Sequence, residues 1–482
     1  MTTKGTDTLD TAFLQALLGP QLTAEQAALI FQQGQEAVVF ALLTLAKQLA
    51  EKPTAAPGTP DPSAPSGQTP PYQKPAGRGR AKPRGARPGH PGHRRPAPPR
   101  IDRREEHTLS ACPRCHAPVR PCSSSRTRVI EDIPADITPV VTEHTIRRYW
   151  CPGCRTTVEP VVTDALPGSA IGLRVVVLSA WLHYLLGTTL AQIIDVFNFH
   201  LHFELSAGGL VQMWHRLREV LLAWYQEIQT RALDSAVLHA DETGWRVNGK
   251  THWLWCFTTT DATYYMIDRS RGSPALKRFF KKEYAGVLVT DFWAAYNAVV
   301  CAQKQKCLPH LLRDLKRTQH YHEPGRDWPA FSKLLKRLIR DSIRLGKRRK
   351  ELSPERFAAR RQRLQGRLRE LLAQPWAQRH ARRLVKRLRR HERELFTFLD
   401  HAEVPSDNNH AERQVRPAVM VRKNSYANGS GEGAETQSVL MSVFRTLKQR
   451  GHNPVSAVLD GMRAYLRTGQ LPPLPAKVAA VG

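Results

Sequence analysis

The chain has 482 residues, of which 72 are Lys or Arg and 42 are Asp or Glu, giving a formal net charge of +30 at pH 7. Such an excess indicates a polyanionic partner, usually nucleic acid, although a merely soluble basic protein can have the same composition. No stretch approaches the roughly 20 apolar residues of a membrane span, and the N-terminus lacks the regions of a signal peptide. We therefore expect an intracellular, cytoplasmic protein with no membrane partner.

The first 51 residues are expected to form an N-terminal helical segment. Residues 24–51 are rich in helix formers, and their apolar side chains recur at helical spacing. The resulting stripe consists of Ile30, Val38, Leu42, Leu45 and Leu49. It suits packing on a partner helix, either in a homo-oligomer or by docking within the same chain.

Residues 52–106 have a different composition, rich in proline and then in arginine, as in "GRGRAKPRGARPGHPGHRRPAPPR". Proline blocks helix and sheet, and apolar side chains are scarce, so we predict a disordered linker. Its arginines could contact phosphate groups without sequence preference, or the segment is only a solubilising tether.

Two C-x-x-C pairs lie in residues 107–165, which we predict to form a zinc-binding module. "CPRC" and "CPGC" are separated by residues 116–150 and supply four thiols, those of Cys112, Cys115, Cys151 and Cys154. Four thiolates suit a closed, structural zinc site, whereas a catalytic zinc needs an open ligand position. The intervening "VIEDIPADITPVVTEHTIRRYW" predicts strands, and Cys122 is expected to take no part.

Residues 166–232 are predicted to be helical. Two amphipathic patterns with the spacing i, i+3, i+4, i+7 flank "ELSAGG", where Ser206 can cap the second helix. The patterns consist of Leu190, Ile193, Ile194 and Phe197, and of Leu210, Met213, Trp214 and Leu217. A helix-turn-helix DNA-binding region has this pattern, and so do many helical hairpins without such a role.

Residues 233–320 have the pattern of an α/β domain. "SAVLHADETGW", "THWLWCFTTT" and "TYYMID" predict three strands, "SPALKRFFKKEY" a helix, and "GVLVTDFWAAYN" a further buried strand. This order opens the ribonuclease H-like fold, a mixed five-stranded sheet in which strands one and four are parallel neighbours. We predict such a catalytic core, a basic helical insertion at residues 321–400, and the rest of the core with C-terminal helices at residues 401–482.

On this topology Asp241 and Asp291 finish neighbouring strands at the same edge of the sheet. Adjacent carboxylates repel each other unless a cation joins them, and magnesium, with manganese as a substitute, prefers such oxygen ligands. Glu242 is a near-equal alternative to Asp241 on spacing alone. Alternatively, Asp291 could cap the helix that begins at "FWAAY", and Asp241 could be a turn residue.

The segment "VPSDNNHAERQVRPAVMVRKNS" supplies a third carboxylate, Glu412. We predict a helix of about nine residues that begins at 405–407 and ends at Pro417, too short to persist undocked. Ala411 and Val415 would form an apolar strip for docking on the sheet. Three carboxylates complete a site for two ions, which clamp the attacking and leaving oxygens of a phosphoryl transfer.

Residues around the acidic site are candidates for DNA contact. Asn409, Arg413 and Arg416 share a helical face with Glu412, although Glu412 could simply pair with Arg416 on a surface helix. The other candidates are His310, Arg313, Arg422 and Lys423. The alternatives are a core position for His310, a plain turn for the glycine-rich "YANGSGEGAE", and solvated surface for the basic insertion. Glu432 and Glu435 lack the polar helical face and are rejected as third ligands.

At these segments the sequence resembles the insertion-sequence-66 family of bacterial DDE transposases. The motifs are "HADETGW", "VTDFWAAYN", "CLPHLLRDL" and "SDNNHAERQVRPAVMVRKNSYANGSGEGAE", followed by "VFRTLKQRGHNP". The resemblance covers nearly the whole chain and implies a ribonuclease H-like domain that uses Asp241, Asp291 and Glu412 with two magnesium ions. It implies cleavage at terminal inverted repeats, transfer of the freed 3′ hydroxyl into target DNA, a homo-oligomer on DNA and small accessory proteins.

Two other functions remain open from the sequence. With the same fold, the chain could stop at hydrolysis as a structure-selective nuclease. With vestigial acidic residues, it would be a zinc-containing DNA-binding regulator. Strand joining by pre-cut ends separates a transposase from the nuclease, and magnesium-dependent nicking excludes the regulator.

Overall fold

The computed structural model describes residues 24–51, 98–121, 126–134, 136–321, 325 and 327–479. They belong to two units, Met1–Gly89 and His90–Gly482. Most of the predicted linker, residues 52–97, and Cys122 lie outside the described residues. No helix in the described part of the chain is long and apolar enough to cross a membrane.

The N-terminal unit contains two helices, over which the predicted apolar stripe is divided. α2 (Ala24–Gln32) and α3 (Gln35–Glu51) are separated at Gly34, whose φ of +96° suits glycine. A small buried cluster consists of Ile30, Ala37 and Ala41. Leu42 is 62% exposed, and its predicted packing on a partner helix stays a prediction. The side chains of Leu45 and Leu49 lie outside the described part.

The cysteine-containing segment has little regular structure. β1 (Tyr149–Cys151) and β2 (Thr156–Val158) form an antiparallel hairpin around the second cysteine pair, and an isolated bridge joins Ala111 to Pro118 around the first. Residues 126–134 and 136–148 contain no strand. The strands predicted there are wrong, because nothing packs on their apolar side chains, which are exposed throughout.

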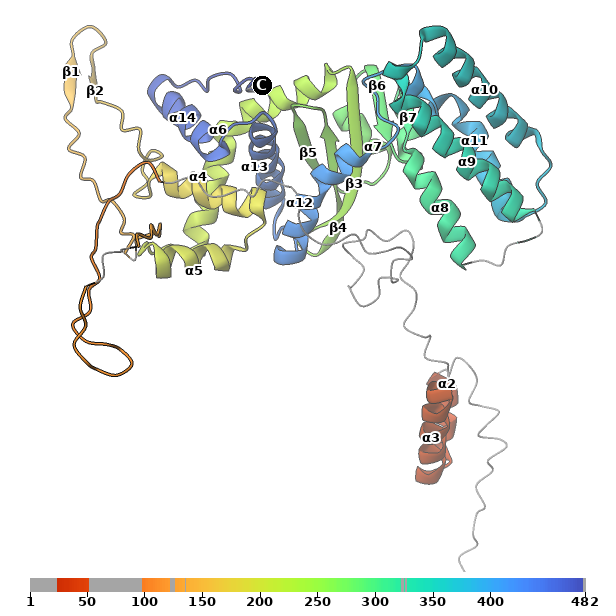
Figure 1. Ribbon diagram of the computed structural model, residues 1–482, viewed down its shortest axis with the longest axis horizontal. Helices are drawn as coiled ribbons and strands as arrows, with labels where there is room; N and C mark the ends of the chain where they lie inside the picture. The colour runs from red at the N-terminus through yellow and green to blue at the C-terminus, as the bar shows by residue number, and fades with distance from the viewer. Residues whose placement is uncertain are drawn as a thin grey trace, which may run out of the picture. The chain divides into compact units, whose positions relative to one another are not determined.

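Five strands form one mixed sheet, as the sequence predicted. They are β3 (Val237–Val247), β4 (Lys250–Thr258), β5 (Thr263–Asp268), β6 (Tyr284–Thr290) and β7 (Cys301–Lys306). α7 (Ser273–Phe279) connects β5 to β6, and η3 (Ala294–Ala298) connects β6 to β7. The order is β5-β4-β3-β6-β7, antiparallel among the first three and parallel from β3 to β6 to β7. The predicted parallel adjacency of strands one and four is confirmed (Figure 1).

One face of the sheet shares a core with helices that precede and follow it in sequence. These are α4 (Leu173–Trp181), the π-helix η2 (Leu182–Leu186), α5 (Leu190–His200), α6 (Ala207–Leu233), α13 (Gly431–Gln449) and α14 (Pro454–Thr468). Ser206 caps α6, as predicted. Trp214, Leu238 and Phe444 belong to one buried cluster, so the core continues across the boundary predicted at residue 232. A DNA-binding role for α5 and α6 stays a prediction.

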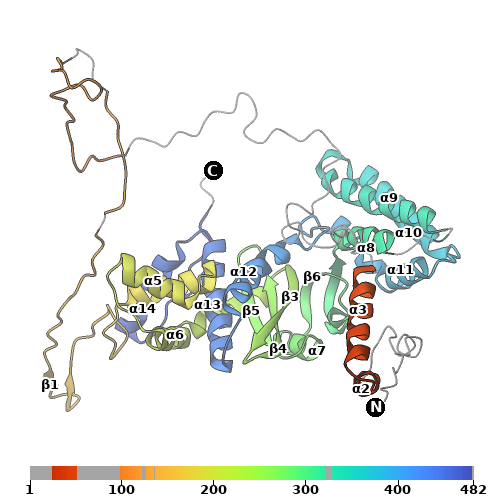
Figure 2. The same cartoon turned by 90° about the horizontal axis from the view of Figure 1, so that it is seen from below.

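α12 (Asn409–Ser425) packs on the opposite face of the sheet (Figures 1 and 2). The predicted docking strip is confirmed, since Ala411 and Val415 are both buried. The predicted end at Pro417 is wrong, because the helix has 17 residues and contains the proline. Ala418 and Val421 beyond it are buried, and their packing outweighs the ~3 kcal/mol that proline costs in a helix interior.

Residues 308–399 are mainly helical and have a hydrophobic core of their own, which also reaches Val287 and Val289 of β6. The elements are α8 (Leu308–Tyr321), α9 (Trp328–Lys347), η4 (Arg349–Glu351), α10 (Pro354–Ala373), α11 (Arg379–Arg390), η5 (Glu392–Glu394) and η6 (Thr397–Leu399). The predicted helical character is confirmed. In α11 the apolar side chains are buried and most arginines are exposed, which leaves a basic outer face.

Candidate active site

Two aspartates lie level with each other at the centre of the sheet. Val237, Leu238 and His239 of β3 pair with Val287, Leu288 and Val289 of β6, a constant offset of 50 positions. The same offset places Asp241 beside Asp291, which directly follows β6 as predicted. Asp241 does not end its strand, and that prediction is wrong, because the antiparallel pairing with β4 carries β3 on to Val247.

Asp241 faces α12, whereas Glu242 faces away from it, because successive strand residues point to opposite sides of a sheet. The side chains on either side of Asp241 along the same face bond to the α12 region. These contacts are from His239 Nδ1 to Asn408 Oδ1, 3.0 Å, and from Arg422 to the Thr243 hydroxyl, 3.0 Å. Asp241 therefore lies on the face that carries Glu412.

Glu242 is held by a separate set of contacts. The guanidinium of Arg271 donates to one of its carboxylate oxygens at 3.1 and 3.2 Å, and the Tyr296 hydroxyl donates to the other at 2.7 Å. Arg271 itself lies between the rings of Trp253 and Trp293, 4.3 and 4.0 Å from their centroids. Since the Glu242 side chain is only 3% exposed, these contacts favour Asp241 as the residue available to a cation.

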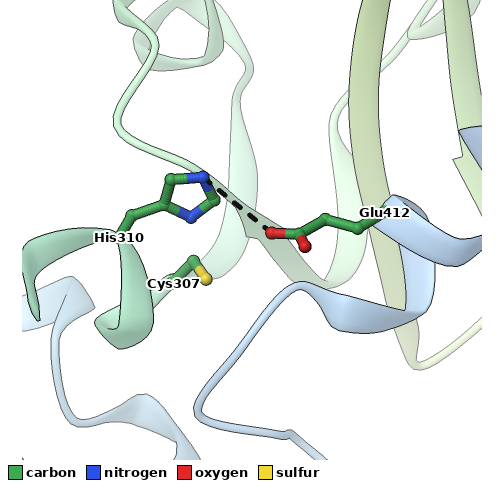
Figure 3. Close-up of side chains that lie close together, drawn as sticks. All are labelled: Cys307, His310 and Glu412. Atoms are coloured by element: carbon green, nitrogen blue, oxygen red, sulfur yellow. Dashed lines mark ion pairs between the residues drawn. The ribbon is translucent and has the colours of Figure 1, made fainter. Parts of the chain in front are cut away.

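Glu412 lies in the first turn of α12 and points toward α8 (Figure 3). One carboxylate oxygen accepts a bond from Arg313 at 2.7 Å, and Nε2 of His310 lies 3.9 Å from the same oxygen. All three side chains are about 30% exposed. The considered pairing of Glu412 with Arg416 is thus replaced by a pairing with Arg313, which comes from a different element.

Asn408 is a positioning residue that the sequence interpretation missed. It is 1% exposed and precedes α12 as its N-cap residue. Its side chain bonds to His239 and donates to the carbonyl of Ala240 at 2.8 Å, while its backbone N–H donates to Cys307 Sγ at 3.3 Å. The double asparagine in "SDNNHAER" marked the segment, but only burial distinguishes Asn408 from its exposed neighbour.

α12 is joined to β3 at three levels. Asn408 bonds to β3 at the start of the helix. Arg422 donates to Thr243 and to the carbonyl of Gly244 near its end. Beyond the helix, Asn428 pairs with Val247 in a parallel bridge and accepts a bond from the Trp245 indole at 2.7 Å. These contacts fix the position of α12 along β3, and therefore the position of Glu412 relative to Asp241.

Burial and neighbouring carboxylates disfavour the charged forms of Asp241 and Glu242. Burial raises the pKa of Asp241 well above its usual value, and the charges of Glu242, Asp291 and Glu412 add to the effect. Burial and Asp291 likewise raise the pKa of Glu242. Among the described residues, the ion pairs of the cluster involve Glu242 and Glu412 and not the two aspartates. A bound cation would relieve this repulsion.

The donor set of Asp241, Asp291 and Glu412 fits a hard divalent cation, because all three offer carboxylate oxygens, that of Asp241 is desolvated, and neither aspartate is held in one of the cluster's ion pairs. Their oxygens do not, however, lie within 4.8 Å of one another. In the described part of the chain, the one group of three potential ligands at that spacing is Cys307, His310 and Glu412. The three acidic residues lie on one face of the sheet, but their carboxylates do not meet, because the side chain of Glu412 points toward Arg313.

The other predicted DNA contacts have different environments. Asn409, Arg413, Arg416 and Lys423 are exposed on the outer face of α12. Arg422 points inward to β3 through its contacts with Thr243 and Gly244. His310 is partly exposed and faces the carboxylate, and burial, with Arg313, holds its pKa below the usual value.

The cysteine pairs form two separate knuckles. The backbone N–H of Cys154 donates to Cys151 Sγ at 3.4 Å, and backbone N–H groups lower the pKa of both Cys112 and Cys151. No three of the four sulfurs lie within 4.8 Å of one another in the described chain. The donor chemistry, two pairs of cysteine thiols, fits zinc.

Comparison with known proteins gives two family matches. The transposase IS66 family matches residues 168–436, more than half of the chain and including all three acidic residues, and the zinc-finger binding domain of transposase IS66 matches residues 110–155. The uncharacterised protein y4qI of Sinorhizobium fredii is 25% identical over 289 residues, 52% of this chain and 52% of that protein. The chain thus spans about half the length of this curated relative. These matches support structural zinc and a DNA-processing role, and the chain belongs to the IS66 family of transposases.

Proposed function

We propose that the chain is a DDE-type transposase with a ribonuclease H-like core, in which Asp241, Asp291 and Glu412 hold two magnesium ions, with manganese as a substitute. The observation that carries this proposal is the common register of Asp241 and Asp291 on parallel strands, under the helix that bears Glu412. The strand order, with two antiparallel strands on one side of β3 and two parallel strands on the other, supports the fold.

The reaction is an in-line displacement at phosphorus in two rounds. A water oxygen attacks the phosphorus at the end of the element, and the bond to the 3′ oxygen breaks to leave a 3′ hydroxyl. That hydroxyl then attacks a target phosphodiester, and the target's own 3′ oxygen leaves. When bound, the metal ions activate the attacking oxygen and stabilise the charge on the leaving oxygen.

The protein side chains prepare the site for that chemistry. Buried Asp241 offers oxygens with high affinity for a cation, because its carboxylate is desolvated and lies among like charges. When a cation is bound, Glu412 would hold it with the oxygen that now accepts from Arg313. The Arg313 guanidinium, which lies beside His310, would then be available to a phosphate oxygen of the DNA.

The partner we propose is double-stranded DNA, both the terminal inverted repeats and the target. Exposed Asn409, Arg413, Arg416 and Lys423 continue from the acidic site along the outer face of α12. The exposed arginines of α11 extend the positive surface of the helical segment. Assembly as a homo-oligomer on DNA and help from accessory proteins complete the proposal, as does a location at the bacterial nucleoid.

The test is nicking of a DNA substrate carrying the element ends, with and without Mg²⁺. We expect Glu412→Gln to abolish nicking while the chain still binds DNA, since the amide keeps the shape but loses the charge. Glu370→Gln removes an exposed carboxylate on α10 and should nick normally. Unchanged cleavage by Glu412→Gln would overturn the catalytic assignment.

Strand transfer separates the transposase from a nuclease of the same fold. With pre-cut ends, the protein should join the 3′ hydroxyl to target DNA. Hydrolysis without joining would indicate the nuclease, and DNA binding without Mg²⁺-dependent nicking would indicate a regulator. Inverted repeats in the DNA that flanks the gene would identify the natural ends.

A further inference from the structure

Cys307, His310 and Glu412 form a compact group of three different potential metal ligands (Figure 3). Cys307 directly follows β7, His310 lies in the first turn of α8, and Glu412 lies in the first turn of α12. One ligand atom from each lies within 4.8 Å of the others. The proposed magnesium site uses only the last of the three.

The surrounding backbone fixes this group in place. The N–H of Asn408 donates to Cys307 Sγ at 3.3 Å, and the N–H of Leu308 donates to the carbonyl of Ser406 at 3.0 Å. These two bonds tie the start of α8 to the residues that lead into α12. The thiol, the imidazole and the carboxylate therefore lie close together because the backbone holds the elements that carry them side by side.

The spacing is close to that of a tetrahedral zinc site. Zinc bonds of about 2.0–2.3 Å to N, O and S ligands place neighbouring ligand atoms roughly 3.3–3.8 Å apart. Nε2 of His310 is 3.9 Å from the nearer oxygen of Glu412, so side-chain rotation has little distance to close. A thiol together with an imidazole selects a soft or borderline cation, whereas magnesium prefers oxygen ligands alone.

We propose that Cys307, His310 and Glu412 bind a divalent cation of the zinc class, and that this ion withdraws Glu412 from the acidic site and so inhibits strand cleavage. The proposed binding of the cation rests on the geometry of the three ligands. The proposed inhibition rests on the proposed function, because it requires Glu412 to serve the reaction.

Arg313 competes directly with such an ion. Its guanidinium lies 2.7 Å from the Glu412 oxygen that would become a ligand, and it must leave when a cation arrives. The thiol must also give up its proton, as coordinated cysteines do. The site should therefore bind more weakly than the four-cysteine module and fill only when free zinc rises.

The first test uses Co²⁺ as the probe on the full chain whose four-cysteine module is already loaded with zinc. Cobalt binds more weakly than zinc and so leaves that module intact. We expect added Co²⁺ to give the absorption of a tetrahedral, thiolate-bound ion, which Co²⁺ held by the carboxylates of the acidic site would not give. Cys307→Ser should lose this absorption. Cys301→Ser, on β7 and outside the group, should keep it.

A second pair of variants keeps the result independent of any folding defect in Cys307→Ser. His310→Gln should also lose the absorption, with near-ultraviolet circular dichroism confirming that the fold is retained. Arg313→Met should bind Co²⁺ about tenfold more tightly, because it removes a charge-assisted bond to a ligand. Equal cobalt absorption in Cys307→Ser and wild type, or no cobalt absorption in the wild type, would overturn the site.

The second test measures how Zn²⁺ affects Mg²⁺-dependent nicking, relative to each variant's own rate without zinc. We expect the wild type and Cys301→Ser to be inhibited and Cys307→Ser to be less sensitive by a factor of about ten or more. Equal sensitivity in the three proteins would overturn the inhibitory role. Absence of nicking in every chain would instead count against the proposed function, and the cobalt test would still decide the site.

Discussion

Asn408 and Asn409 are adjacent in the sequence and have opposite environments. Asn408 is buried and satisfies groups on β3 and at Cys307, whereas Asn409 is exposed on α12. We predict that Asn408→Ala lowers the free energy of unfolding by about 2–3 kcal/mol, since it leaves buried polar groups unpaired. Asn409→Ala should change it by less than about 0.5 kcal/mol.

Chemical denaturation of both variants measures this difference. The slope of the transition should stay unchanged, because neither substitution alters the surface exposed on unfolding. Equal stability of the two variants would contradict the placement of Asn408 between α12 and β3.

Lys306 is a fully buried lysine behind the acidic site. Its ammonium donates to the Thr290 hydroxyl at 3.0 Å and lies 3.9 Å from Glu394, and burial lowers its pKa from 10.5 to about 8. Between these values the unfolded chain binds the additional proton, so the free energy of unfolding rises with pH across this window. The full effect is about 3 kcal/mol.

Lys306→Met should remove this rise, as measured by denaturation at several pH values through the window. The relevant quantity is the difference in the free energy of unfolding between wild type and variant at each pH. Lys277→Met, which removes an exposed ammonium on α7 that does not contribute to the pKa of Lys306, supplies the control and should retain the wild-type slope. A parallel pH dependence for wild type and Lys306→Met would contradict the prediction.

At the scale of elements, Gly286 allows β3 and β6 to approach each other. A Cβ added there would lie 2.6 Å from the carbonyl oxygens of both Ser235 and Ala236, which neither backbone can avoid without moving. Gly286→Ala should therefore cost about 1–3 kcal/mol of stability and reduce nicking, because the register of the two aspartates depends on this strand pair.

Gly366 on α10 supplies the matched control. A Cβ at Gly366 meets nothing within 4 Å, so Gly366→Ala should raise the melting temperature, with a gain of about 0.5–1 kcal/mol from helix propensity. Destabilisation by both alanines, or by neither, would show that the contact at Gly286 is not the cause.

The sequence predicted four strands because alternating and buried apolar runs determine strands locally, whereas β7, with the sequence CAQKQK, has no such run and was expected only from the ribonuclease H-like pattern. The sequence did not predict the length of α12, because the cost of Pro417 is offset by burial of Ala418 and Val421, a tertiary effect. The sequence also left Asp241 and Glu242 as nearly equal candidates for the metal ligand. Only the pairing of β3 with β4 and the contact of Glu242 with Arg271 distinguish them.

At the scale of the whole molecule, the excess of 72 Lys and Arg over 42 Asp and Glu makes the DNA affinity dependent on salt. Replacing Arg413 and Arg416 together by alanine should reduce the slope of log affinity against log salt by up to about 2, one unit for each phosphate group that is no longer neutralised. The decrease in affinity should be similar for all DNA sequences, as measured by fluorescence anisotropy at several salt concentrations.

Replacing Lys281 and Lys282 together by alanine is the charge-matched control. Both are exposed between α7 and β6, away from α12, and their removal should leave the slope nearly unchanged. Equal slopes for the two double variants would show that α12 does not carry the DNA contact and that the positive charge acts diffusely.

The sequence also predicted that the segment of residues 321–400 is helical, as the structure shows. The hydrophobic core crosses the domain boundaries that the sequence predicted, because the buried cluster of the sheet includes Trp214 before residue 232 and Phe444 after residue 401. Such a core, assembled from segments far apart in the chain, has no local pattern from which its extent could be read.

The three attachments of α12 to β3, through Asn408, Arg422 and Asn428, restrict how the acidic residues can come together. Because the helix is attached to the strand at three points, rigid sliding or tilting of α12 would break several hydrogen bonds at once. Rotation about the side-chain torsions of Glu412 breaks only its contact with Arg313. Ion capture at this centre should accordingly be a fast, local rearrangement, without the slow hinge closure by which many enzymes assemble their catalytic groups.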